Sequence, residues 1–253
     1  MLPIQVAVPS RYPPVVTWCL IALNSGIFLF EISLSPSELE PFLQRFALIP
    51  ARYFGAYADS DPSVTAYLPF FTNMFLHGGL LHLGFNMWTL WLFGPTVEDR
   101  LGRARYLAFY IVCGVCASLA HAVFNPTSTI PALGASGAIS GVLGGFMLMF
   151  PFAQLVVVIP ILFFPFFFEL PAMVFAGVWF LTQVLSGTVQ LFMPEQAGGI
   201  AWWAHIGGFV AGVVLTPVLR QSTERYRTYY ADEGVLGFDP SGRRRTVLEG
   251  RHS

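Results

Sequence analysis

The sequence predicts an all-α membrane protein, a bundle of six transmembrane helices with a long first outer loop. First, 55% of the 253 residues are hydrophobic and only 11% are charged, whereas soluble domains carry about 25% charged residues. Second, the mean hydropathy is +0.63, and several segments reach the roughly 20 apolar residues that cross a bilayer. Third, a soluble protein this apolar could not cover its surface, so we expect a polytopic membrane protein of one domain.

The chain is expected to begin with a cytoplasmic lead, residues 1–14, followed by a first span at about 15–34. This apolar run is too long for the core of a cleavable signal peptide and lacks a small-residue cleavage site, so we expect it to be retained. Residues 35–78 form the long outer loop. Repeated prolines interrupt this loop, and its amphipathic pieces, such as residues 42–48, suit the membrane interface.

Span two is predicted at about 79–95 and is followed by a short charged turn at 97–105. Span three then runs from about 106 to 124. A loop with two prolines, residues 125–131, leads to span four, which begins at about Ser136 and ends near Phe150.

Residues 152–168 are apolar but broken by prolines, so we expect a re-entrant or surface loop there. Span five is predicted at about 171–192, because an acidic residue followed by a proline in the first turn is typical of a helix start. Span six at about 201–219 completes a membrane domain that covers residues 15–219. The polar, arginine-rich tail, residues 220–253, is expected to be flexible and cytoplasmic.

The arginines give the orientation, since all 13 basic residues are arginine. With six spans, the outer side holds only Arg45 and Arg52, and the remaining arginines lie in the lead, the charged turn and the tail. The positive-inside rule therefore places both termini in the cytoplasm, as in a bacterial inner membrane. It also brings the starts of spans two, four and six together at the outer face. The net charge of −1 gives no reason to expect a nucleic-acid partner.

Glycines crowd the start of span four, where five of the twelve residues 134–145 are glycine. Glycine costs about 1 kcal/mol relative to alanine inside a helix, so this density needs a packing or chemical reason. Small residues four apart lie on one helix face and let a neighbouring helix approach closely. The predicted packing glycines are Gly134, Gly137, Gly141 and Gly145 at span four, and Gly208 and Gly212 on span six.

Close packing of spans four and six would bring Ser136 to His205 near the outer face. A serine hydroxyl is a weak nucleophile until a base within hydrogen-bond reach takes its proton. No acidic residue near His205 in the sequence is available to orient its ring, so we expect a dyad and not a triad. The alternative is that Ser136 only caps the helix, since serine is a preferred N-cap.

His82 and Asn86 lie one turn apart near the start of span two, where polar residues are costly in a membrane. Attack on an amide carbonyl develops negative charge that needs preorganised donors. His82, Asn86 and the backbone N–H of Ser136 are the predicted oxyanion donors. The alternative for the two side chains is a structural hydrogen bond between helices.

The motifs Gly134-Ala-Ser-Gly137, His82-Leu-Gly-Phe-Asn86 and Ala204-His-Ile-Gly-Gly-Phe-Val-Ala-Gly212 together resemble the rhomboid intramembrane serine proteases. The resemblance covers about residues 15–219. It implies Ser136 as nucleophile, His205 as general base and acid, and His82 and Asn86 as oxyanion helpers. It also implies cleavage of transmembrane segments of other membrane proteins within the bilayer, with span five and residues 193–200 as gate and cap, and without a metal or cofactor.

Four further residues are compared with the family pattern. His77 matches a family histidine at the junction of loop and span, for which we expect structural support. The sequence has Leu68-Pro69 where many members have Trp-Arg, and Ser140 where many have an aromatic residue. Two other functions stay open: a catalytically silent binder of transmembrane segments, and a small channel or transporter lined by the polar residues.

Overall fold

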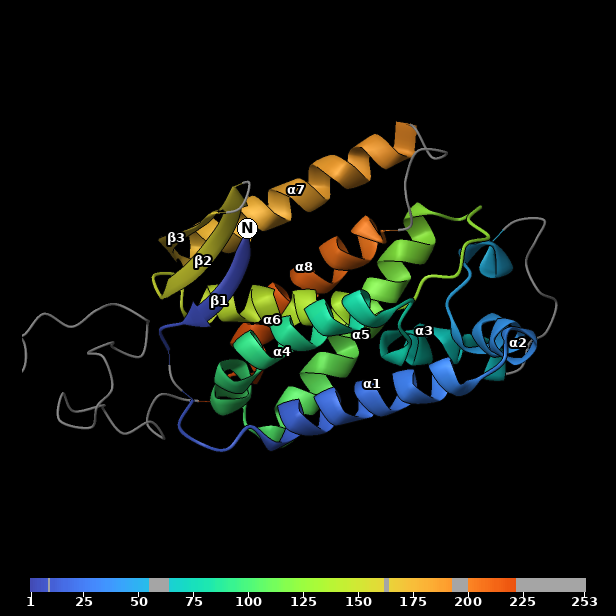
Figure 1. The fold of residues 1–253 in the computed structure, drawn as a ribbon, viewed down its shortest axis with the longest axis horizontal. Coiled ribbons are helices and arrows are strands. Elements are labelled where there is room, and N and C mark those ends of the chain that lie inside the picture. Colours follow the sequence, from blue (N-terminus) through green and yellow to red (C-terminus); the bar gives the residue numbers. More distant parts are fainter. Residues whose placement is uncertain (9, 55–63, 162–163, 193–199, 222–253) are drawn as a thin grey trace, which may run out of the picture.

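The structure, a computed structural model, describes residues 1–8, 10–54, 64–161, 164–192 and 200–221. Within these residues it is mostly helical, and a small sheet lies beside the start of α7 (Figure 1). The long helices are α1 (Val15–Ser33), α4 (Leu80–Leu101), α5 (Arg103–Phe124), α6 (Ser136–Met149), α7 (Ala172–Phe192) and α8 (Trp202–Leu219). The predicted class, an all-α membrane bundle, is confirmed at this level.

Four of the described helices are long and apolar enough to cross a membrane: α1, α5, α7 and α8. Helix α6 is apolar but has only 14 residues. Helix α4 has 22 residues and carries charged residues in its last turns. The count of six spans therefore stays a prediction.

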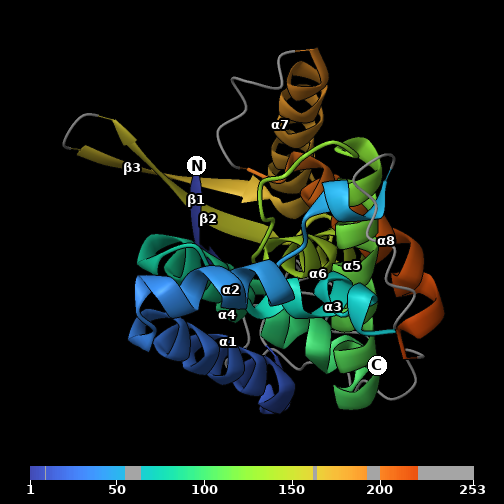
Figure 2. The same ribbon diagram turned by 90° about the vertical axis from the view of Figure 1, so that its right-hand side faces the viewer.

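A three-stranded antiparallel sheet contradicts the prediction of a loop at 152–168. Its order is β1-β2-β3, formed by β1 (Leu2–Val6), β2 (Gln154–Ile161) and β3 (Phe164–Pro171). Valines at 156–158 favour extended backbone, and the partner strand comes from the N-terminal lead, far away in the sequence. Figure 2 shows β1 lying between α4 and β2.

The predicted long outer loop contains short helices. They are α2 (Pro36–Phe46), η1 (Pro50–Tyr53), η3 (Val64–Tyr67), α3 (Pro69–Thr72) and η4 (Asn73–Phe75). The Thr72 hydroxyl donates to Phe46 O at 2.7 Å, and Leu48 forms a β-bridge with Ala132. Buried Pro69 starts α3. The first two contacts hold the loop, and the departure from the family pattern at Leu68-Pro69 lies at the start of α3.

The N-terminus of α1 is capped by a carboxylate from α4. Glu98 is 3% exposed and accepts from Val16 N at 2.9 Å, Thr17 N at 2.8 Å and the Thr17 hydroxyl at 2.8 Å. These donors have no intrahelical acceptor, and the negative charge suits the positive end of the helix dipole. Glu98 therefore joins the beginning of α1 to the end of α4.

The predicted turn at 97–105 is much shorter in the structure. Helix α4 continues to Leu101 and α5 starts at Arg103, so only Gly102 separates them. Its φ of 80° lies in the left-handed region, which glycine adopts without the penalty of a side chain.

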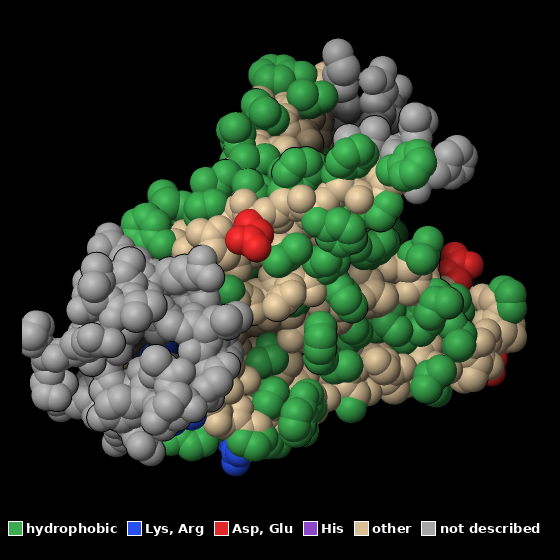
Figure 3. All heavy atoms as spheres, turned by 60° about the vertical axis from the view of Figure 1, so that its left-hand side comes forward, with side chains coloured by type: hydrophobic (Ala, Val, Ile, Leu, Met, Phe, Trp, Pro, Cys, Tyr) green, Lys and Arg blue, Asp and Glu red, His purple; other side chains and the backbone are tan. Residues whose placement is uncertain are grey.

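Hydrophobic side chains cover much of the face shown in Figure 3, and charged side chains are sparse on it. A water-facing surface would not carry so many contiguous apolar side chains. The predicted flexible tail lies outside the described residues apart from Arg220 and Gln221. Most of the predicted cap at 193–200 also lies outside them.

Candidate active site

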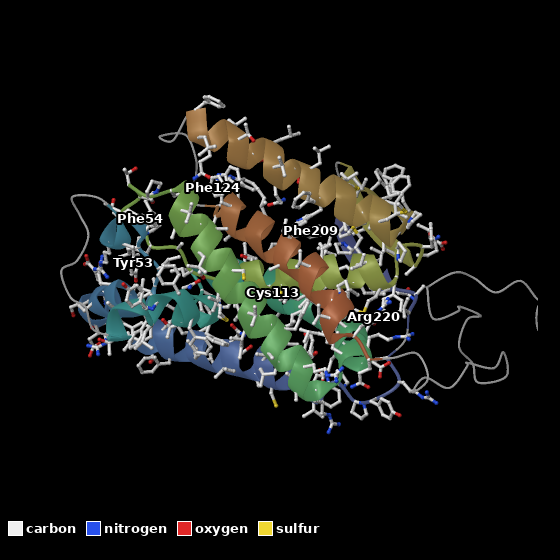
Figure 4. All side chains as sticks on the ribbon, turned by 180° about the vertical axis from the view of Figure 1, so that it is seen from behind. Tyr53, Phe54, Cys113, Phe124, Phe209 and Arg220 are labelled. Carbon is white, nitrogen blue, oxygen red and sulfur yellow. The ribbon has the colours of Figure 1, made fainter. Side chains whose placement is uncertain are left out.

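Helices α6 and α8 approach each other almost to backbone contact. A Cβ added to Gly208 would overlap the carbonyl oxygen of Gly137, and one added to Gly212 would overlap that of Gly141. On its other side α6 packs against α5, because a Cβ on Gly141 would lie 2.5 Å from Cys113 Cβ. Figure 4 labels Cys113 on α5 and Phe209 on α8.

The close approach also involves the last predicted packing glycine on α6. A Cβ on Gly145 would lie 2.8 Å from the Thr216 hydroxyl of α8 and 3.0 Å from the Phe109 ring of α5. Helix α6 is therefore enclosed by α5 and α8 along most of its length, which holds its first residue in a fixed place.

Ser136 and His205 meet at one end of this helix pair. His205 Nε2 lies 2.9 Å from Ser136 Oγ, and both side chains are half-buried. Ser136 is the first residue of α6 and follows Ala135 as N-cap, so its backbone N–H has no acceptor within the helix. The N-cap role considered for Ser136 thus falls to Ala135.

His82 and Asn86 lie beside Gly134, two residues before Ser136. A Cβ on Gly134 would be 2.8 Å from the His82 ring and 3.7 Å from Asn86 Nδ2, and its φ of 129° also favours glycine. Asn86 is 7% exposed, and its Nδ2 has no hydrogen-bond partner among the described residues. A buried amide donor without an acceptor is costly, so it is available to a group that enters the site.

A cavity of about 260 Å³ lies beside the serine, the histidine and Asn86. It is lined by Ser136 and His205, and Asn86 contributes from α4. The N-terminal residues Met1, Leu2 and Pro3 also line it. The dyad therefore faces an open space, lined in part by exposed side chains such as Phe85, and does not merely fill a packed core.

A second, smaller cavity of about 20 Å³ lies on the other side of Ser136. Asn73, Ser118 and His121 contribute its polar lining, and Asn73 Nδ2 donates to the Ser118 hydroxyl at 2.8 Å. A cavity of this size with polar partners suits one water molecule.

Gln183 of α7 is a site residue that the sequence reasoning missed. Its Oε1 lies 2.8 Å from His205 Nδ1. A glutamine inside an apolar span is unusual and could have drawn attention to this position. That its side chain faces His205 depends on how α7 packs on α8, which the sequence does not give.

Ser140 lines the cavity together with His205. Its hydroxyl donates to Ser136 O at 2.6 Å. The aromatic neighbours of His205 do not come from α6: they are Trp179 of α7 at 5.9 Å and Trp202 of its own helix α8 at 6.4 Å between ring centroids. His205 therefore has aromatic neighbours although position 140 is a serine.

His77 lies outside the cavity. Its ring packs edge-on against His82 at 5.3 Å, and its backbone N–H donates to the Glu31 carboxylate at 3.2 Å. Burial, and to a lesser extent nearby His82, lowers the pKa of His77 to about 4. The ring is therefore neutral near pH 7, which suits a packing contact.

The described residues bring together no three His, Cys, Asp or Glu side chains in a way that would hold a metal ion. Cys113 and Cys116 are free thiols. The groups gathered around Ser136 can instead transfer protons and donate hydrogen bonds.

Comparisons with known proteins point to one family. The model of the Rhomboid domain matches residues 65–222. The chain is similar to Rhomboid protein 1, mitochondrial, of Saccharomyces cerevisiae, with 27% identity over 225 residues and 86% of this chain. It is also similar to Rhomboid protease GluP of Bacillus subtilis, with 34% identity over 144 residues and 56% of this chain.

A third relative is Presenilin-associated rhomboid-like protein A, mitochondrial, of Danio rerio, with 31% identity over 181 residues and 68% of this chain. The matches cover 57% of the yeast protein, 26% of the Bacillus protein and 41% of the zebrafish protein. The shared region is therefore only part of each relative.

Proposed function

The chain belongs to the rhomboid family of integral membrane proteins, and from this premise we propose that it is an intramembrane serine endopeptidase. The observation that carries the proposal is the 2.9 Å contact between Ser136 Oγ and His205 Nε2 beside a cavity. A serine that serves only packing needs neither a base within hydrogen-bond reach nor an adjoining space.

In the proposed reaction, Ser136 Oγ attacks the carbonyl carbon of the scissile amide while its proton passes to His205 Nε2. The negative charge formed on the carbonyl oxygen is held by the Ser136 backbone N–H and by Asn86 Nδ2, with the His82 ring as a further donor. His205 then gives its proton to the leaving amide nitrogen. The C–N bond breaks and an acyl-enzyme remains on Ser136.

The second half of the proposed reaction needs water inside a membrane protein. Water attacks the acyl carbon while its proton passes to His205 Nε2, and that proton returns to Ser136 Oγ as the ester bond breaks. The small polar cavity beside Ser136 supports the proposal, because it has room for the water that this step consumes.

The proposed substrates are transmembrane segments of other membrane proteins, cut near the outer face. An intact helix hides its carbonyls in internal hydrogen bonds, so small or helix-breaking residues are expected at the cut. The orientation with both termini in the cytoplasm rests on the arginine distribution. Residence in a bacterial plasma membrane is also a proposal. The relatives include a protein of Bacillus subtilis as well as mitochondrial proteins.

The test is cleavage in liposomes that contain only the purified protein and a tagged transmembrane segment with a glycine-alanine pair near one end. We expect two fragments, with the cut within roughly two helical turns of the outer boundary as located by mass spectrometry. Binding of the segment without any cleavage would favour the silent binder. Leakage of an ion gradient without cleavage would favour the channel.

A further inference from the structure

Two polar contacts hold the His205 ring, one on each nitrogen. Nε2 faces Ser136 Oγ at 2.9 Å, and Nδ1 faces Gln183 Oε1 at 2.8 Å. The orientation of the Gln183 amide follows from its other end, where Nε2 donates to Trp179 O at 3.2 Å and to the Thr182 hydroxyl at 3.1 Å. The oxygen of Gln183 is therefore the atom that faces the histidine.

An amide oxygen can only accept a hydrogen bond, so the facing His205 Nδ1 must carry a proton. In a neutral imidazole the other nitrogen then has the free lone pair. That nitrogen is Nε2, which lies against the Ser136 hydroxyl. Gln183 thus selects the tautomer in which His205 accepts the serine proton.

Building on the proposed function, we propose that Gln183 is a positioning residue that fixes the tautomer and ring orientation of His205. The Gln183 side chain is neutral and only 5% exposed inside an apolar helix. An unpaired carboxylate would be costly in such a place. Trp179, one turn earlier on α7, also contacts the ring. A displacement of α7 therefore disturbs the base as well as the shape of the cavity.

The test compares Gln183→Met with Gln183→Glu. Methionine has a similar length but does not hold the Nδ1 proton, so we expect a fall in kcat of about 10- to 100-fold with KM nearly unchanged. Glutamate keeps an oxygen that can accept from Nδ1 but loses the N–H that donates to Trp179 O, so its kcat should lie between the Gln183→Met and wild-type values. Gln190→Met, on the same helix, is the matched control and should leave kcat within about twofold.

A spectroscopic readout separates this proposal from the proposed function. ¹⁵N NMR of histidine-labelled protein should show His205 as the Nδ1–H tautomer in the wild type and a tautomer mixture in Gln183→Met. The same tautomer in both proteins, or an unchanged kcat in Gln183→Met, would overturn the positioning role. A wild type that cleaves nothing but shows the expected tautomer would instead refute the proposed function.

A separate observation concerns β1, the strand whose first residues line the cavity. Pro3 O accepts from Trp88 Nε1 of α4 at 2.8 Å, and Val8 O accepts from the Thr96 hydroxyl of α4 at 3.1 Å. On its other side β1 pairs with β2, in a register that places Gln5 opposite Val156. An extended segment of the chain thus lies along α4 and reaches the space beside Ser136 and His205 (Figures 1 and 2).

A substrate must unwind to expose its scissile carbonyl, and its freed N–H and C=O groups then need partners away from water. The edge of β2 that pairs with Leu2, a residue lining the cavity, offers such partners. We infer, again building on the proposed function, that the surface formed by the β2 edge and α4 docks the unwound apolar segment of the substrate, which replaces β1 by strand addition. The apolar side chains of Leu2, Ile4 and Val6 indicate the chemistry that this surface accepts.

A disulfide lock tests this docking surface. Gln5→Cys with Val156→Cys, in a Cys19→Ser background, places two thiols on directly paired residues, where the spacing of paired strands suits a disulfide. The oxidised protein should cleave the transmembrane segment at least about tenfold more slowly than the same protein after reduction. Labelling by a small fluorophosphonate should be equal in both forms.

Equal cleavage by the oxidised and reduced forms would overturn the docking surface, and so would a lock that removes labelling together with cleavage. A reduced form that is neither labelled nor able to cleave would refute the proposed function itself.

Discussion

Replacement of Ser136 by alanine is expected to lower the turnover of a transmembrane substrate by at least about 10⁴-fold. Among the described residues that line the cavity, Ser136 is the hydroxyl that lies at hydrogen-bond distance from His205 Nε2. The proposed reaction therefore has no substitute nucleophile there. Cleavage in liposomes, followed as product formed per enzyme per minute, measures the change. Ser33→Ala, at the exposed end of α1, is the control and should keep full activity.

The same measurement should show that Ser136 and His205 act as one unit. His205→Ala is expected to lose about as much activity as Ser136→Ala, and the double variant should be no worse than either single variant. If the fold losses of the two single variants multiplied in the double variant, the two residues would act independently. That result would contradict the proposed mechanism, in which Ser136 Oγ gives its proton to His205 Nε2 across the 2.9 Å contact.

The second large effect is expected for Gly208→Val. The new Cβ would overlap the carbonyl oxygen of Gly137, and backbone cannot move aside as a flexible side chain can. Separation of α6 from α8 by about 1 Å would lengthen the contact between Ser136 and His205, and a misplacement of this size can cost about 100-fold in rate. Overpacking of the helix pair should also destabilise the fold by about 3 kcal/mol.

Thermal unfolding in detergent and the cleavage assay together check this prediction. Gly26→Val on α1 is the matched control, since a Cβ at Gly26 meets nothing within 4 Å. An active and stable Gly208→Val protein would show that the close approach of α6 and α8 does not hold the site together.

Much of the bundle was predictable because its signals are local. The bounds of α1, α5, α7 and α8 follow from apolar runs that end at polar residues, and Gly137, Gly141, Gly208 and Gly212 repeat at the spacing of one helix face. Small residues at this spacing indicate a close helix contact without any knowledge of the partner.

The sheet was not predicted because its pairing is not local. Residues 152–168 contain prolines and bulky apolar residues that also suit a membrane loop, and nothing in that segment indicates a partner at residues 2–6. The turn at 97–105 was misjudged for a different reason: charged residues such as Glu98 indicated solvent, but Glu98 is buried as the cap of α1.

The candidate site was partly predictable in the same sense. Ser136, His205, His82 and Asn86 stand out as polar residues at the ends of apolar spans. Gln183 does not stand at an end, and its contact with His205 depends on the rotation of α7 about its axis. The aromatic neighbour of His205 likewise comes from Trp179 of α7 and not from position 140.

The central claim is that His205 activates Ser136 for nucleophilic attack, and a fluorophosphonate probe measures this directly. The purified wild-type protein should form a covalent adduct that peptide mass spectrometry locates on Ser136, whereas Ser136→Ala and His205→Ala should stay unlabelled under the same conditions. An adduct on another residue, equal labelling of the three proteins, or an unlabelled wild type that still binds a transmembrane segment would contradict it.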